Sequence, residues 1–167
     1  MTDIAIYDLV DFPHWIPIIT GWFFLEWYPL DGESQVESEH RIGEWLKKNR
    51  LHAVLVAVVD GEPVGTVALQ DKTLPLGDSP WITGLHVVPG FRNRGIGTRL
   101  LRTAENKARA IGLSKVYLYT PRAARLYGTL GWLRHQDTVA FPRNAAVMEK
   151  RLSPHTLFQP HPPALRG

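Results

Sequence analysis

The sequence predicts a mixed α/β fold, because strand-like and helix-like segments follow one another along its 167 residues. Short runs of β-branched and aromatic residues mark the strands, and apolar residues at helical spacing mark the helices. Hydrophobic residues make up 44% of the chain, which is enough for a substantial core. We therefore expect one domain, over residues 1–152, followed by a proline-rich tail at 153–167 that is extended or disordered.

The first part of the chain predicts a strand and an aromatic helix. Residues 4–9 have the composition of a strand, and residues 13–28 have the apolar density of a buried helix. We expect five side chains of this helix to pack inward: Ile18, Ile19, Trp22, Phe23 and Leu25. Its aromatic residues exceed what one helix face buries, which suggests that some rings line a groove or an interface.

A polar loop and a second helix are predicted next. Residues 29–39 contain glycine and charged residues and no apolar periodicity, which is typical of a loop. Residues 40–49 predict a short helix, for which Ser38 is a candidate N-cap.

A β-hairpin and a central strand follow. Residues 51–59 and 63–69 are apolar strands, and the Asp60-Gly61 pair between them is typical of a type I′ turn. After a polar loop, residues 81–88 predict the central strand. A glycine inside that strand indicates a bulge or a close backbone approach.

The most regular helix is predicted over residues 97–111 and is ended by Gly112. Five apolar residues at helical spacing form its inner face: Leu100, Leu101, Ala104, Ala108 and Ile111. The polar residues are expected to point away from that face: Arg99, Arg102, Glu105, Asn106, Lys107 and Arg109.

The loop before this helix predicts an anion site. The first turn of a helix leaves backbone N–H groups without partners, and the helix dipole makes that end partly positive. Gly95 and Gly97 carry no Cβ, so that a diphosphate could lie directly against the backbone. Arg92 and Arg94 add positive charge at the same end.

Two other glycine-rich phosphate loops are excluded. The dinucleotide fingerprint G-x-G-x-x-G requires glycine at position 100, where this chain has Leu100. The Walker loop requires Gly-Lys followed by Ser or Thr, and the sequence lacks that triplet.

The last part of the chain predicts a strand, a short helix and two closing strands. Residues 114–120 alternate as a strand, and Pro121 suits the first position of a helix that ends at Gly131. Its apolar face is expected to comprise Ala123, Leu126, Tyr127 and Leu130, with Leu126 supplying core. Residues 133–141 and 145–152 predict the closing strands.

Two motifs together resemble those of the GCN5-related N-acetyltransferase (GNAT) family. The first is R-x-x-G-x-G after a strand that ends L-x-V-x-P, which here is Leu85-His86-Val87-Val88-Pro89 followed by Arg92, Gly95 and Gly97. The second comprises Ala123, Leu126-Tyr127 and Leu130-Gly131-Trp132. The resemblance covers residues 3–152, and the specific motifs lie within 81–132.

The resemblance implies a fold, an activity and a cosubstrate. The GNAT fold has a mixed, mostly antiparallel sheet of about six to seven strands with helices on both faces. A bulge, here at Gly84, splays the fourth and fifth strands. Members are acetyl-CoA-dependent acyltransferases that need no metal, and a backbone N–H of the fourth strand polarises the thioester carbonyl.

The resemblance also implies which residues bind the cofactor. The pantetheine arm pairs with backbone groups of Leu85 and Val87, in the manner of an added strand. The implied cofactor-binding residues are Leu85, His86, Val87, Arg92, Asn93, Arg94, Gly95, Ile96, Gly97, Thr98, Thr120 and Tyr127. Many members carry asparagine where this chain has Thr120, and a hydroxyl can replace only one of its hydrogen bonds.

By motif position Tyr127 is the general acid that protonates the departing thiolate. The general base is open, and the candidates are Glu26, His86, Tyr119 and Asp78. His86 alternates with its neighbours on the central strand, which puts its side chain on the other face of the sheet. Some N-terminal acetyltransferases of the family use a histidine at the position of Tyr119, and this chain departs from them there.

The acceptor is expected to be a primary amine of a small molecule or a peptide, attacked directly in a ternary complex. Trp22, Glu26, Trp27 and the 29–39 loop are candidates for the acceptor wall. Two alternatives are open: a CoA-binding sensor or interaction domain without turnover, and a member that acetylates aminoacyl-tRNA. The second predicts binding that falls steeply with salt.

Composition limits the remaining classes of partner, mechanism and location. The net charge is only +3, and six of the 19 Lys and Arg fall within residues 92–109, which suits cofactor phosphates better than a nucleic-acid partner. The absence of cysteine excludes a disulfide framework and an acyl-cysteine mechanism. The sequence shows neither a membrane-spanning run nor a signal peptide, so we expect a cytoplasmic protein without a membrane partner. The resemblance also allows a homodimer, since members often pair through their last strands.

Overall fold

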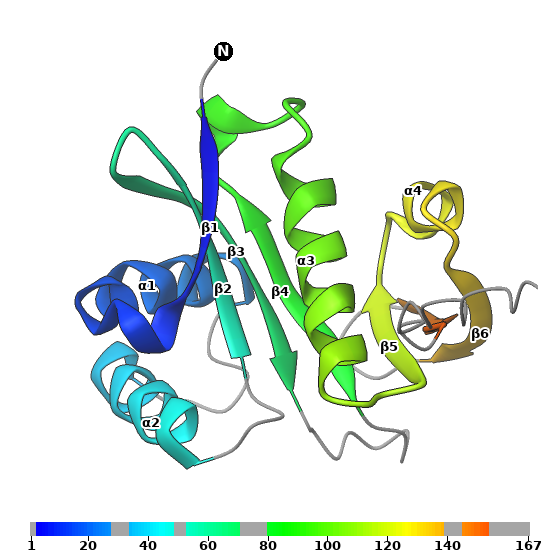
Figure 1. Ribbon diagram of the computed structural model, residues 1–167, viewed down its shortest axis with the longest axis horizontal. Coiled ribbons are helices and arrows are strands. Elements are labelled where there is room, and N and C mark those ends of the chain that lie inside the picture. Colours follow the sequence, from blue (N-terminus) through cyan, green and yellow to red (C-terminus); the bar gives the residue numbers. More distant parts are fainter. Residues whose placement is uncertain (1–2, 28–33, 49–52, 71–79, 139–144, 154–167) are drawn as a thin grey trace, which may run out of the picture.

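The computed structural model describes residues 3–27, 34–48, 53–70, 80–138 and 145–153. A seven-stranded sheet in the order β1-β2-β3-β4-β5-β7-β6 runs through the molecule (Figure 1). All neighbouring strands are antiparallel except β4 and β5, which are parallel. The expected mixed, mostly antiparallel sheet is therefore confirmed.

The strands and helices have the following bounds. The strands are β1 Ile4–Asp8, β2 Ala53–Val59, β3 Glu62–Gln70, β4 Trp81–Val87, β5 Lys115–Thr120, β6 Leu133–Thr138 and β7 Ala145–Arg151. The α-helices are α1 Ile16–Trp27, α2 Gln35–Lys48, α3 Ile96–Ala110 and α4 Ala124–Thr129. Short 3-10 helices are η1 Leu9–Asp11, η2 Pro13–Trp15 and η3 Pro89–Phe91.

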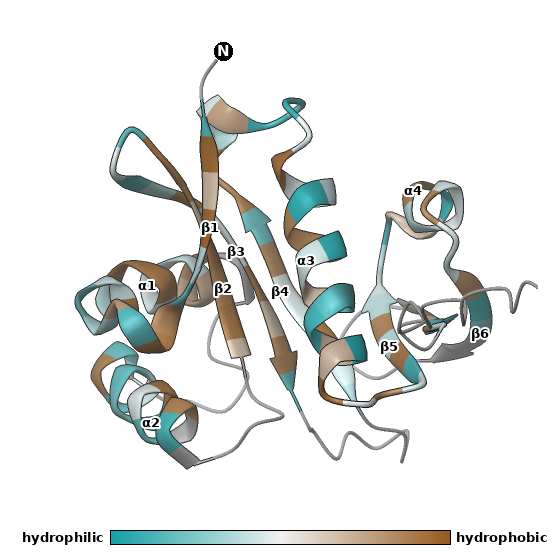
Figure 2. Ribbon diagram, viewed as in Figure 1, coloured by the Kyte–Doolittle hydropathy of each residue, from teal (hydrophilic) through white to brown (hydrophobic). Residues whose placement is uncertain are grey.

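Helices pack on both faces of the sheet, as expected. On one face α3 covers the larger core, where its apolar residues meet those of β2, β3, β5 and β7. On the other face α1 and α2 cover a second core that includes Ile19, Ile42 and Val56. Because both faces of β2 are covered, all of its residues are buried, and Figure 2 shows it as an apolar strand.

The sheet opens between β4 and β5, as expected. The two strands pair only at Trp81 and Tyr117. The ladder between β3 and β4 shifts register opposite Gly84, which has a positive φ of 63°. A Cβ at that glycine would lie 2.7 Å from the ring of Phe23 in α1, so the close approach of this ring also requires glycine.

The hairpin and the end of α3 also follow the predictions. Asp60 and Gly61 have φ values of 51° and 85°, and two positive φ angles define a type I′ turn. Gly112 has a φ of 89° immediately after the end of α3, which is the left-handed conformation that ends many helices.

The predicted start of the second helix was wrong. The helix α2 begins at Gln35, so residues 35–39, predicted as loop, are helical. Ser34 and Glu37 form a reciprocal cap, in which the Ser34 amide donates to the Glu37 carboxylate at 2.8 Å and the Glu37 amide donates to the Ser34 hydroxyl at 3.3 Å. This cap starts the helix four residues before Ser38, so Ser38 lies inside the helix and is not its N-cap.

The predicted inner face of α1 was partly wrong. Ile19 is fully buried and both Trp22 and Phe23 are half-buried, but Ile18 is 42% exposed and Leu25 is 83% exposed. The helix is apolar on every side, so hydrophobic periodicity gives no orientation there. The predictions for residues 29–33, 71–79 and 154–167 lie outside the described residues.

Candidate functional site

The loop before α3 turns its backbone sharply at two residues. Asn93 and Gly95 have positive φ angles of 60° and 77°. Gly95 is the N-cap of α3, and the first helical hydrogen bond is donated by Arg99 to the carbonyl of Gly95. The amides of Ile96, Gly97 and Thr98 therefore precede the hydrogen-bonded ladder, and glycine offers no side chain to cap them.

The two glycines of the loop meet different surroundings. A Cβ at Gly95 would have no heavy atom within 4 Å, so the space beside it is open and its positive φ is what requires glycine. A Cβ at Gly97 would lie 3.8 Å from Cγ2 of Val87, at the end of β4. The start of α3 can therefore accept an anion beside the end of the central strand.

The side chains of Arg92 and Arg94 contact groups at the base of the loop. The Nε of Arg92 donates a hydrogen bond of 2.8 Å to the carbonyl oxygen of Val87. The guanidinium of Arg94 lies 5.0 Å from the centre of the Phe91 ring. Arg92 thus joins the start of the loop to the end of β4, in addition to supplying positive charge.

The basic cluster within 92–109 is divided over the surface of α3. Lys107 forms an ion pair with Asp8 at the end of β1, and Arg109 donates to Asn106 on its own helix. Arg102 is exposed. Lys107 and Arg109 are thus engaged within the protein, because a helix distributes such residues around its axis.

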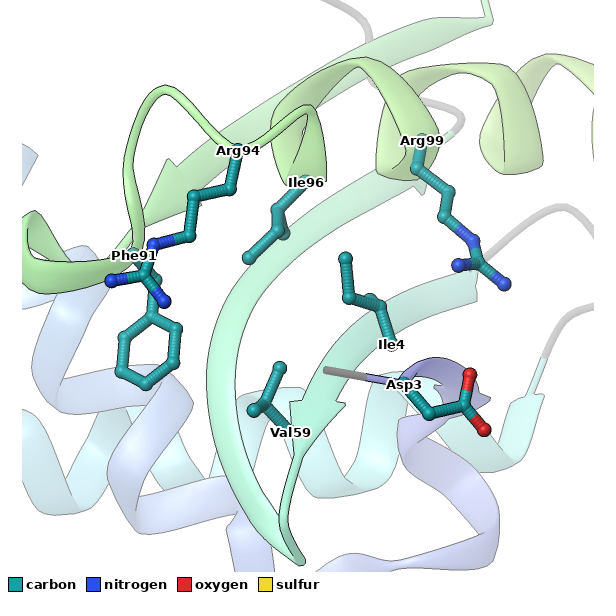
Figure 3. A pocket seen from close by; sticks show the side chains of 7 residues that line it. All are labelled: Asp3, Ile4, Val59, Phe91, Arg94, Ile96 and Arg99. Atoms are coloured by element: carbon teal, nitrogen blue, oxygen red, sulfur yellow. The ribbon is translucent and has the colours of Figure 1, made fainter. Parts of the chain in front are cut away.

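A pocket of about 600 Å³ opens between α3 and β1 (Figure 3). Its lining residues are Asp3, Ile4, Val59, Phe91, Arg94, Ile96 and Arg99. The opposite flank of α3 carries Glu105, which contacts Trp132 and Lys150 beyond the gap between β4 and β5. The pocket is thus separate from that gap. It was not predictable from sequence patterns, because β1 is distant from α3 along the chain.

The side chains of β4 alternate as predicted. Leu85 and Val87 pack against the core under α3. The imidazole of His86 faces the other side, where its centroid lies 5.2 Å from that of Trp22 in α1. The structure therefore brings together one base candidate and one acceptor-wall candidate. The side chains of Glu26 and Trp27, and all of Asp78, lie outside the described residues.

Tyr127 is more buried than its neighbour Leu126. Tyr127 is half-buried against the larger core, and its ring lies 6.3 Å from the Trp132 ring at an interplanar angle of 68°. Leu126, predicted as core, is 57% exposed. Burial raises the pKa of the Tyr127 phenol above its ordinary value, so it stays protonated at neutral pH.

Thr120 ends β5 and shapes the turn into α4. Its hydroxyl oxygen accepts a hydrogen bond of 2.9 Å from the amide of Ala123. The helix begins at Ala124, so the prediction that Pro121 occupies its first position was wrong. The Thr120 hydroxyl oxygen thus accepts a bond within the turn, and its proton remains available to donate to another group.

Tyr119 packs against a small cluster formed by Trp81, Tyr117 and Val147. It is half-buried, and its ring lies 6.1 Å from that of Trp81. Burial raises the pKa of its phenol, which disfavours the phenolate that a general base would need. At neutral pH Tyr119 therefore keeps its proton and is poorly placed to accept another.

One charged residue of α3 is buried, against expectation. Glu105 was expected to point away from the core, but it is only 3% exposed. Its carboxylate accepts a hydrogen bond of 3.0 Å from Nε1 of Trp132 and one of 2.8 Å from Nζ of Lys150. Its position one turn after the buried Leu101 was the available signal.

The described part of the chain contains neither a metal-ligand cluster nor a membrane-spanning helix. Among residues 3–27, 34–48, 53–70, 80–138 and 145–153, no three His, Cys, Asp or Glu side chains are grouped as metal ligands. Within the same residues, none of the helices has the length and apolar character to cross a membrane.

Comparisons with known sequences agree with the fold. Residues 17–132 match the family model described as the acetyltransferase (GNAT) family. Over 92 residues the chain is 36% identical to the aminoglycoside N(6')-acetyltransferase type 1 of Klebsiella aerogenes. The match covers 51% of this chain and 60% of that protein, so it spans less than two thirds of the relative.

Solved structures show the same architecture at low identity. An aminoglycoside 6'-N-acetyltransferase complexed with coenzyme A has a TM-score of 0.70 at 18% identity, over 91% of this chain and 98% of that one. A GNAT acetyltransferase from Streptococcus pneumoniae has a TM-score of 0.68 at 18% identity, over 90% and 100%. A mutant spermidine N-acetyltransferase from Vibrio cholerae has a TM-score of 0.70 at 16% identity, over 89% and 94%.

Proposed function

Because this chain belongs to the GNAT acetyltransferase family, we propose that it transfers the acetyl group of acetyl-CoA to a primary amine. The observation that carries the proposal is the uncapped start of α3 beside the gap between β4 and β5. The neighbour that was solved with coenzyme A has this fold. In this proposal acetyl-CoA is the cosubstrate, and the reaction requires no metal.

The proposed donor site uses mainly backbone groups. The amides of Ile96, Gly97 and Thr98 bind the diphosphate, with Asn93 and Arg94 at the rim of the loop. Backbone groups of Leu85 and Val87 bind the pantetheine arm, which takes the place of the missing strand pairing. The open space beside Gly95 supports this assignment, because nothing there obstructs an anion.

The proposed chemistry is direct transfer between donor and acceptor. The neutral amine attacks the thioester carbonyl carbon, and the C–N bond forms as the C–S bond breaks. The Tyr127 phenol gives its proton to the departing thiolate, for which its protonated state at neutral pH is suited. The amine proton passes to a base, for which we propose His86 and keep Glu26 as the alternative.

The proposed acceptor is a small, amine-rich molecule. The curated relative is named for aminoglycosides and one structural neighbour is named for spermidine, and both compounds carry several primary amines. Trp22 lies beside His86 and supplies one wall of the acceptor site in this proposal, with Trp27 further along α1. An aromatic wall suits a cationic amine, because a ring face attracts positive charge.

Calorimetry and a thiol-release assay test the proposal. Acetyl-CoA is titrated into the protein, and thiol release is then followed with an aminoglycoside, with spermidine and with a peptide that has a free α-amine. We expect cofactor binding and faster release with the two small amines than with the peptide. Binding without release on any amine would support a CoA sensor instead, and the lack of binding would refute the donor site.

A further inference from the structure

The corner between α4 and β6 connects Tyr127 to the rest of the sheet. The carbonyl oxygen of Tyr127 accepts hydrogen bonds from the amides of Leu130 and Trp132, at 2.9 and 3.1 Å. Gly131 between them has a φ of 88°, which turns the chain back into β6. The position of the Tyr127 backbone is therefore coupled to that of residues 130–132.

A buried carboxylate and an ammonium hold this corner from outside. Glu105 in α3 accepts the indole N–H of Trp132 on one oxygen and the Lys150 ammonium on the other, at 3.0 and 2.8 Å. The same ammonium, from β7, also donates to the carbonyl oxygen of Leu130 at 2.8 Å. The corner is thus held at two points, one on a side chain and one on the backbone.

The charged pair is costly to bury, so its position in the fold calls for an explanation. The side chains of Glu105 and Lys150 are 4% and 19% exposed. A buried ion pair is weak evidence for stability, since apolar residues of similar volume often stabilise as well. In some proteins such a pair specifies one arrangement of the elements that it connects, because other arrangements leave a charge without a partner.

We propose that Glu105 is a positioning residue for Tyr127. The proposal rests on the proposed function, in which Tyr127 is the acid. Glu105 lies nine residues beyond Ile96, about 13 Å along the helix axis, so it is too far to touch a diphosphate at the start of α3. It acts through Trp132 and Lys150, which hold the corner and thereby fix the phenol relative to the donor site.

Hydrogen exchange tests whether Glu105 holds the corner, without any need for turnover. In Glu105→Gln, we expect peptides covering residues 124–132 to exchange about tenfold faster than in the wild type. The matched control is Glu149→Gln in β7, which removes another carboxylate that pairs with His135 and Lys115. Glu149→Gln should leave the exchange rates of residues 124–132 unchanged. Equal exchange in Glu105→Gln and the wild type would overturn the proposal.

A double-mutant cycle tests whether the corner acts on the acid. We expect Glu105→Gln to lower kcat about tenfold while the Kd for acetyl-CoA changes less than about twofold. In a Tyr127→Phe background the same substitution should change kcat less than about twofold. An equal loss in both backgrounds would show that Glu105 does not act through Tyr127 and would overturn the proposal.

Two further measurements keep the outcomes separate. If Glu105→Gln does not fold, Trp132→Phe removes the indole N–H together with part of the buried ring and should raise exchange in the same segment. Unchanged exchange in that variant would again overturn the proposal. If the wild type releases no thiol with any amine, the proposed function fails. The exchange measurement would then still decide whether Glu105 holds the corner.

Discussion

Arg92 donates from Nε to the carbonyl oxygen of Val87 at 2.8 Å, and this bond joins the first residue of the glycine loop to the last residue of β4. Two parts of the proposed donor site, one for the diphosphate and one for the pantetheine arm, are thereby fixed relative to each other. The Arg92 guanidinium is therefore a structural part of the loop as well as a source of charge.

Arg92→Ala should weaken acetyl-CoA binding at least about tenfold, because a hydrogen bond to a charged group contributes about 1.5–3 kcal/mol. The matched control is Arg102→Ala, which removes an exposed arginine from α3. Titration calorimetry of both variants measures the difference. If the two affinities fall equally, the effect of Arg92 is one of general charge, and the bond to Val87 does not matter.

Gly95→Glu should abolish acetyl-CoA binding, because a carboxylate would project beside the amides that bind the diphosphate. The substitution also strains the backbone, since Gly95 has a φ of 77°. Gly112→Glu controls for that strain, because Gly112 has a φ of 89° at the other end of the same helix and similarly open surroundings. Equal loss of binding in both variants would attribute the effect to strain alone.

Tyr127→Phe should lower kcat about 100-fold and change the Kd for acetyl-CoA less than about twofold, because it removes the proton donor and keeps the packed ring. Single-turnover thiol release and calorimetry separate the two quantities. Tyr117→Phe removes a phenol from the small cluster with Trp81 and Val147 and serves as the control. Wild-type turnover in Tyr127→Phe would refute the acid assignment.

Two half-buried tyrosines should make stability fall at alkaline pH. Burial raises the pKa of both Tyr119 and Tyr127 above 10.0, so the unfolded chain loses these protons first as the pH rises. The free energy of unfolding should therefore decline from about pH 10 upward, and the decline should be smaller in the variant with phenylalanine at both positions. Urea denaturation at several pH values measures this decline. The control is Tyr7→Phe, which removes an exposed phenol.

The elements that the sequence could predict are those with strong local patterns. The helix α3 has apolar residues at regular spacing, and Gly84 and Gly112 have the backbone angles that their contexts require. The site loop was predictable for the same reason, since the free amides at the start of α3 follow from chain direction and two glycines.

The remaining features depend on residues that are distant along the chain. Glu105 is buried because Lys150, 45 positions later, supplies the partner charge. Helix α1 is apolar on all sides, so only its contact with the sheet decides that Ile19 is buried and Leu25 exposed. Neither local spacing nor propensity contains that information.

His86→Gln tests the base assignment. If His86 accepts the amine proton, kcat/KM in the wild type should fall at acidic pH as the imidazole becomes protonated, and this acidic limb should be absent from the slower variant. His135→Gln is the matched control, because His135 is exposed on β6 and pairs with Glu149. Thiol release from pH 5 to 9 (about the range in which imidazole titrates) measures the profiles. An unchanged acidic limb in His86→Gln would exclude this histidine, and the carboxylate of Glu26 would then be the base to test, because it belongs to the same helix as Trp22.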